Sequence, residues 1–110
     1  MGVTVESNRH LDRIESLKAA PAAVRFVSFE PLLDDLIDLT PELLDGIHWA
    51  IVGGESGGGA REMKLEWAGR IQRLSSQLGI PFFFKQVGSF GGAPHKGGDI
   101  LGGHTWQEKP

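Results

Sequence analysis

The sequence predicts an α/β fold, a parallel βαβαβαβ unit that is either half of a TIM-like (β/α) barrel or a small open sheet. Short apolar strand segments alternate with segments of helical periodicity, which is the pattern of a parallel sheet with right-handed crossovers. The fourth strand segment, Pro81-Phe82-Phe83-Phe84-Lys85-Gln86, is nearly continuous in apolar residues, as buried parallel strands tend to be.

The beginning of the chain predicts two strands separated by a helix. Residues 1–6 have the composition and the apolar–polar alternation of a strand. Ser7 or Asn8 is expected to cap the helix that follows. Apolar residues then recur at helical spacing until Pro21 ends the element. Residues 24–29 predict the second strand.

A second crossover is predicted between residues 32 and 46. Residues 32–39 form a short apolar stretch, after which Thr40 is suited to cap a helix and Pro41 to occupy its first turn. Gly46 is expected to stop that helix, and residues 48–52 predict the third strand.

The third crossover begins with the glycine-rich segment 53–59. An amphipathic helix follows, with apolar residues from Trp67 to Leu78 on one face and Gly79 just beyond its end. Residues 81–86 predict the fourth strand.

The composition limits the organisation of the chain. Its 110 residues with 40% apolar content predict one structural unit, with the partial barrel over residues 1–88 and an ordered glycine-rich tail over residues 89–110 packed on it. The net charge of −3 without a basic stripe argues against a nucleic-acid footprint in this segment. The sequence lacks a long apolar run, so a soluble cytoplasmic protein outside the membrane is expected. The absence of cysteine excludes thiolate ligands and disulfides within this chain.

A weak repeat places a carboxylate at the end of three strands. The repeats are Val-Thr-Val-Glu6-Ser, Val-Ser-Phe-Glu30-Pro and Val-Gly-Gly-Glu55-Ser, and Lys85 has the corresponding position in the fourth strand. Because strand side chains alternate between faces, these groups are expected to converge at the mouth of a barrel, where such folds bind ligands. The candidate ligand-binding residues are Thr4, Glu6, Ser7, Ser28, Glu30, Gly53, Gly54, Glu55, Ser56, Arg61, Lys85 and Gln86.

Convergence would raise the carboxylate pKa values through mutual repulsion and desolvation, while Lys85 could keep one acid ionised. The alternative is that each glutamate accepts hydrogen bonds from the next loop and is structural. Arg61 could meet an anionic group, or it could pair with Glu62 or Glu66 on the surface. The glycine-rich segment lacks the ending of a phosphate-binding P-loop, and the histidines lack the spacing of a metal site, so no metal is predicted.

Five segments resemble a phage and prophage family of radical-SAM-like proteins that carry a three-cysteine motif. They are Gly2-Val-Thr-Val-Glu-Ser, Pro21-Ala-Ala-Val-Arg-Phe-Val-Ser-Phe-Glu-Pro-Leu-Leu, Trp49-Ala-Ile-Val-Gly-Gly-Glu-Ser-Gly, Pro81-Phe-Phe-Phe-Lys-Gln and Gly103-His-Thr-Trp. The resemblance is to the C-terminal half of that family.

This resemblance implies S-adenosylmethionine and a [4Fe–4S] cluster in the full-length protein, with the cluster cysteines in an N-terminal half. It also implies that Thr4, Glu6 and Ser7 lie near the ribose of S-adenosylmethionine, and that Glu30 and residues 53–56 lie near the adenine or the substrate. No cofactor is expected from this chain alone, because cluster ligation needs thiolates.

Three functional hypotheses follow. The leading one is an incomplete half-barrel, inactive alone and completed by an N-terminal partner half, because a strand is predicted from residue 1 and cysteine is absent. The second is a small module that binds a nucleotide-like or amine ligand through its strand-end carboxylates. The third is a self-assembling unit in which two copies pair as a homodimer to close a barrel-like sheet.

Overall fold

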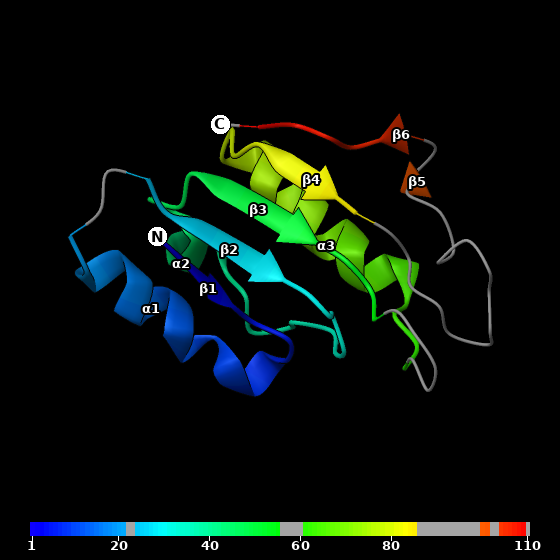
Figure 1. Cartoon of the computed structure of the whole chain (residues 1–110), viewed down its shortest axis with the longest axis horizontal. Coiled ribbons are helices and arrows are strands. Elements are labelled where there is room, and N and C mark those ends of the chain that lie inside the picture. Colours follow the sequence, from blue (N-terminus) through cyan, green and yellow to red (C-terminus); the bar gives the residue numbers. More distant parts are fainter. Residues whose placement is uncertain (22–23, 56–60, 86–99, 102–103, 110) are drawn as a thin grey trace.

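The structure is a computed structural model that describes residues 1–21, 24–55, 61–85, 100–101 and 104–109. Its centre is a four-stranded sheet with the order β1-β2-β3-β4, in which every neighbouring pair is parallel (Figure 1). The strands are β1 (Gly2–Thr4), β2 (Phe26–Phe29), β3 (Trp49–Val52) and β4 (Phe82–Phe84). The predicted α/β fold with a parallel sheet is therefore confirmed, and each strand is shorter than the sequence suggested.

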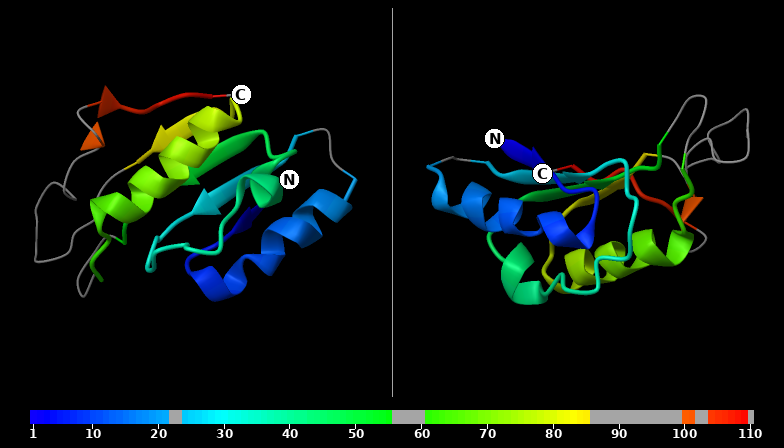
Figure 2. Two further views of the ribbon diagram at one scale, coloured as in Figure 1. Left: turned by 180° about the vertical axis from the view of Figure 1, so that it is seen from behind. Right: turned by 90° about the horizontal axis from the view of Figure 1, so that it is seen from below.

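The helices of the three crossovers lie on the same face of the sheet (Figure 2). Right-handed crossovers that always step to the next strand in one direction must place their helices on one side. A doubly wound sheet instead reverses its strand order and covers both faces. The crossovers contain η1 (Asn8–His10) with α1 (Asp12–Ala19), then α2 (Pro41–Leu44), then α3 (Leu65–Gln77).

The covered face of the sheet, which is the face that carries these helices, forms the hydrophobic core. Alternate strand residues are fully buried there, and Ile14 of α1 and Ile71 of α3 pack against them. Burying apolar surface between the sheet and helices is the main source of stability for such a fold. The strand residues of the covered face are Val27, Phe29, Ala50, Val52, Phe82 and Phe84.

The open face is the opposite side of the sheet, and among the described helices none lies against it. Its side chains are Phe26, Ser28, Trp49, Ile51 and Phe83, all of which are half-buried. The ring of Trp49 stands edge-on to those of Phe26 and Phe83, with centroids 6.3 and 6.2 Å away. Aromatic side chains thus line the open face from β2 to β4.

Gly2 lets this aromatic row extend over β1. A Cβ atom at this position would collide with the ring of Phe26, so the absence of a side chain in β1 leaves room for that ring. The close approach explains why the first strand begins with glycine.

The start of α1 differs from the prediction. A short 3-10 turn comes first, and neither Ser7 nor Leu11 caps a helix with its side chain. The side chain of Asn8 bonds Asp38 instead, because a long-range partner is available. At α2, by contrast, the hydroxyl of Thr40 accepts a hydrogen bond from the backbone N–H of Leu43, as predicted.

Residues 32–39 form a loop that is anchored in the core. Leu32, Leu36 and Leu39 are buried, and the carboxylate of Asp35 accepts two hydrogen bonds from the guanidinium of Arg70 on α3. The apolar stretch read from the sequence is therefore a series of anchors that ties the loop to the helical layer.

A C-terminal segment lies along the outer edge of β4. After the antiparallel pair β5 (Ile100–Leu101) and β6 (His104–Thr105), the N–H of Phe84 bonds the carbonyl of Trp106, and the N–H of Glu108 bonds the carbonyl of Phe82. The indole N–H of Trp49 also donates to the carbonyl of Glu108 at 2.8 Å. Residues 106–108 thus cover the edge of β4 in an antiparallel manner.

Candidate ligand site at the carboxyl ends of the strands

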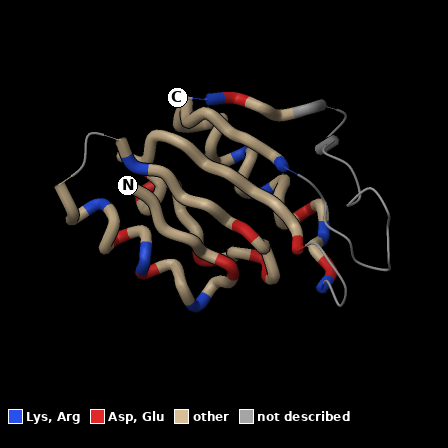
Figure 3. The backbone as a smooth tube through the Cα atoms, viewed as in Figure 1, with Lys and Arg blue, Asp and Glu red and all other residues tan. Residues whose placement is uncertain are grey.

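The predicted site residues fall into separate groups near the carboxyl ends of the strands. Acidic positions gather at these ends on β1, β2 and β3, with Lys85 at the end of β4 (Figure 3). The structure brings Glu30 and Lys85 together and places Glu6 and Glu55 each beside an arginine of its own. The carboxylates therefore do not meet one another as a single cluster.

Glu30 and Lys85 meet across the sheet although β2 and β4 are not neighbours. The ammonium Nζ of Lys85 lies 3.2 Å from Oε1 of Glu30, and the hydroxyl of Ser28 lies 3.5 Å from the same oxygen. The strand between them continues into Gly53, which has no side chain to separate the pair. Ser28, Glu30 and Lys85 thus form a polar end to the open face.

An apolar trough lies beside this ion pair on the open face. Its floor consists of Phe26, Trp49, Ile51 and Phe83, and Ser28 with the ion pair forms its polar end. The trough has a volume of about 270 Å³. The arrangement combines an apolar surface with one positive and one negative group.

Glu6 lies at the other edge of the sheet, beside α1. Its Oε1 atom accepts a hydrogen bond of 2.9 Å from the guanidinium of Arg13, which also donates to the carbonyl of Thr4 at 2.8 Å. Arg13 therefore fastens the end of β1 to the helix. This contact supports a structural contribution for Glu6 alongside any contact with a ligand.

A cavity of about 850 Å³ opens beside Glu6. Asn8 lines this cavity and contacts the loop after β2. Its backbone N–H donates a hydrogen bond to the carboxylate of Asp34, and its side-chain amide donates one of 2.6 Å to the carboxylate of Asp38. Glu6, Asp34 and Asp38 present carboxylate oxygens to the cavity, and Arg61 with His10 supplies nitrogen atoms. Ser7, which the sequence singled out, also lines it.

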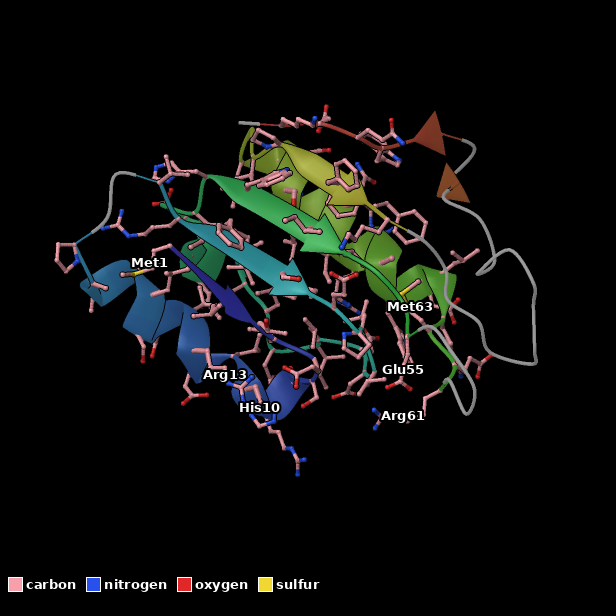
Figure 4. The ribbon with its side chains drawn as sticks, in the orientation of Figure 1. Met1, His10, Arg13, Glu55, Arg61 and Met63 are labelled. Atoms are coloured by element: carbon pink, nitrogen blue, oxygen red, sulfur yellow. The ribbon has the colours of Figure 1, made fainter. Side chains whose placement is uncertain are left out.

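Glu55 and Arg61 form the most complete ion pair of the site (Figure 4). The guanidinium donates two hydrogen bonds of 3.0 and 2.8 Å to the carboxylate, and the backbone N–H of Arg61 donates a third of 2.9 Å. These bonds lower the pKa of Glu55 from 4.5 to about 2 and raise the pKa of Arg61. The expected increase of carboxylate pKa is therefore wrong for Glu55, because an arginine and not another acid is its neighbour.

The partner of Arg61 also differs from the surface alternative. Arg61 pairs with Glu55, at the end of β3, and not with Glu62 or Glu66. Glu55 also accepts a hydrogen bond from the backbone N–H of Arg61. This bond agrees with the alternative that this glutamate is structural.

The remaining candidates contribute backbone or lie outside the described residues. The carbonyl of Gly53 accepts from Leu32, and Gly54 is buried next to it. Thr4 is exposed on β1. Ser56 and Gln86 lie outside the described residues. Within the described part of the chain, no group of three or more metal-ligating side chains was found.

Several groups near these sites were not among the ligand-binding candidates named from the sequence. They are Asn8, Asp34 and Asp38 of the cavity, and Phe26, Trp49 and Ile51 of the trough. The trough residues could have been found by continuing the alternation of Glu30 and Gly53 backward along their strands. The loop contacts of Asn8 depend on a fold across 30 residues and had no local signal.

Residues 1–110 match a family described as a protein of unknown function, DUF5131. The chain belongs to the DUF5131 family. No curated protein and no solved structure matches the sequence.

Among the described residues of this DUF5131 chain, no helix has both the length and the apolar character needed to cross a bilayer.

Proposed function

We propose that the chain is the C-terminal half of a radical-SAM-like (β/α) barrel and gains a closed ligand site when further β/α units join it. The observation that carries this proposal is the one-sided sheet. Four parallel strands in sequential order, with their described helices on one face, match the geometry of consecutive barrel units.

The side chains of the open face support the same proposal. On the open face, Phe26 and Trp49 are at the amino ends of their strands. Ser28, Ile51 and Phe83 share the next level, and Glu30 with Lys85 is at the carboxyl ends. A barrel interior has this order, because bulky residues fill its lower layers and polar groups surround its mouth. Further β/α units that extend the sheet into a partial barrel would bury the aromatic rings of Phe26, Trp49 and Phe83.

The two edges of the sheet indicate where further units would join. The outer edge of β4 already pairs with residues 106–108, whereas β1 pairs only with β2 among the described strands. A homodimer closed as a barrel would need the β4 edge of each copy. A partner half that joins at β1 could leave the β4 edge covered and form a partial, open barrel, so the covered edge favours this arrangement over a closed pair of two copies.

The residues of this chain fit one of the two implied cofactors. Glu6, Asp34 and Asp38 place carboxylate oxygens around the cavity, and such acceptors suit the ribose hydroxyls and the ammonium group of S-adenosylmethionine. The 110 residues include no cysteine, so they cannot supply thiolate ligands to a [4Fe–4S] cluster. The chain would bind and orient S-adenosylmethionine, and the partner half would hold the cluster.

The proposal is tested by co-expressing the tagged chain with the cysteine-bearing N-terminal half of a longer relative, without oxygen. We expect a one-to-one complex by light scattering, with iron and sulfide bound and with affinity for S-adenosylmethionine. Separate elution of the two halves at all concentrations would contradict the proposal.

A matched pair of variants connects the binding to the cavity. Glu6→Gln should weaken binding of S-adenosylmethionine by about tenfold through loss of one charge-assisted hydrogen bond. Glu15→Gln should leave binding unchanged, because Glu15 is exposed on α1. Equal affinity of both variants would remove Glu6 from the proposed site.

A second candidate function is a module that binds a nucleoside or amine without any partner. The cavity beside Glu6 favours it, because its carboxylates are held by contacts within this chain. Calorimetric titration of the chain with adenosine and with a polyamine tests this candidate. Binding to the chain alone would favour it, and binding only to the complex would favour the half-barrel.

A further inference from the structure

We propose that the trough on the open face binds the amino-acid head and apolar body of a small zwitterionic ligand. The juxtaposition that leads to this inference is the ion pair of Glu30 and Lys85 at the end of an aromatic surface. This inference rests on the proposed function, since further β/α units would enclose the trough beneath the mouth of the barrel.

The ion pair is accessible and can exchange partners. The side chain of Lys85 is 47% exposed and that of Glu30 is 26% exposed, so both heads are in reach of a ligand. A surface ion pair of this kind contributes little to the stability of the fold. Replacing it with two ligand contacts therefore costs the chain little stability. The carboxylate of Glu30 would accept hydrogen bonds from the ligand ammonium, and the ammonium of Lys85 would donate to the ligand carboxylate.

The spacing of the pair suits a ligand that carries both charges on neighbouring atoms. Oε1 of Glu30 and Nζ of Lys85 are 3.2 Å apart, so one compact head group can contact both. The ammonium and the carboxylate of an α-amino acid are separated by one carbon atom. A ligand with a single charge would bind either Glu30 or Lys85, and the other side chain of the pair would lose its partner.

The floor of the trough suits an apolar body. Trp49 is its centre, with Phe26 and Phe83 edge-on at each side and Ile51 next to them. The indole is fixed by its hydrogen bond to the carbonyl of Glu108, so the surface is formed before a ligand arrives. A volume of about 270 Å³ is suitable for an amino acid and too small for most larger cofactors.

Trp49 makes this inference measurable in the chain itself. L-phenylalanine is the probe, and phenethylamine and 3-phenylpropionate are matched probes that lack the carboxylate and the ammonium. Titrations are followed by tryptophan fluorescence and by calorimetry, with the chain alone and with the co-expressed complex. The Trp49→Phe variant should lose the fluorescence change and weaken the calorimetric signal, whereas Trp67→Phe on α3, outside the trough, should keep both.

We expect L-phenylalanine to bind at least tenfold more tightly than either singly charged probe. Lys85→Met should remove this preference over phenethylamine, and Glu30→Gln should remove the preference over 3-phenylpropionate. Equal affinity for the three probes, or no binding of L-phenylalanine to either the chain or the complex, would overturn the inference.

The variants also separate this inference from the proposed function. Lys85→Met and Glu30→Gln should still form the complex with the partner half, as measured by light scattering. If the complex forms and the probes do not bind, the half-barrel is retained and the zwitterion site is rejected. If L-phenylalanine binds to the chain and no complex forms, the half-barrel is rejected and the trough is retained.

Discussion

The two faces of the sheet are built from the same strands, but the described helices pack against only one of them. On the covered face, Val27, Phe29, Val52 and Phe82 are fully buried under the helices. On the open face, the residues that alternate with them are half-buried, although they include aromatic rings. The difference indicates that the covered face specifies the fold of this chain and that the open face remains available for further contacts.

The largest expected effect comes from two phenylalanines on opposite faces. Phe29→Ala should reduce the free energy of unfolding by about 3–5 kcal/mol, because it opens a cavity in the core. Phe83→Ala should cost about 1 kcal/mol, because its ring is already partly in contact with water. Urea denaturation of both variants measures the difference. Equal losses would contradict the distinction between the faces.

The alternation that separates these faces could be predicted from the sequence. The parallel order followed from the strand segments and their helical connections, and the cap at Thr40 followed from its Thr-Pro-Glu pattern. Glu30 and Lys85 were placed on the same face of the sheet because side chains alternate between the two faces along each strand. These features depend on local chemistry, so a single sequence contains them.

The features that were missed depend on contacts between distant segments. The partners of the three glutamates were decided by where Arg13, Arg61 and Lys85 reach in three dimensions. Ser7 or Asn8 was expected to cap a helix, but the side chain of Asn8 bonds Asp38 in the loop after β2. Periodicity in the sequence gives no information on these loop positions.

A smaller effect is expected at Asn8, which fastens the loop beneath the covered face. Asn8→Ala removes two side-chain hydrogen bonds to Asp38 and should cost about 1–2 kcal/mol of unfolding free energy. The neighbouring Arg9→Ala is the control, because Arg9 is exposed and should change stability by less than about 0.5 kcal/mol. If both variants have the stability of the parent chain, Asn8 does not hold the loop.

The smallest effect concerns the pH dependence of the Glu55–Arg61 pair. The pKa of Glu55 is lowered from 4.5 to about 2 in the folded chain, so the pair stabilises the fold above the usual pKa. This contribution should disappear as the pH falls from about 4.5 toward 2, when the carboxylate gains a proton. It should be small, since both side chains are in contact with water.

Comparison of the parent chain with Glu55→Gln measures that contribution. The difference between their unfolding free energies should shrink as the pH is lowered through this range. A difference that does not change with pH would indicate that the charge of Glu55 does not stabilise the fold.

The proposed half-barrel predicts that the open face becomes the inward face of a barrel when other β/α units join it. Ile51→Glu places a charge in the middle of this face, where the side chain is half-buried, and Ile37→Glu places the same charge at an exposed loop position. Circular dichroism first establishes that both variants fold. Co-purification with the cysteine-bearing half should then be lost for Ile51→Glu and kept for Ile37→Glu, whereas equal recovery of folded Ile51→Glu would contradict the claim.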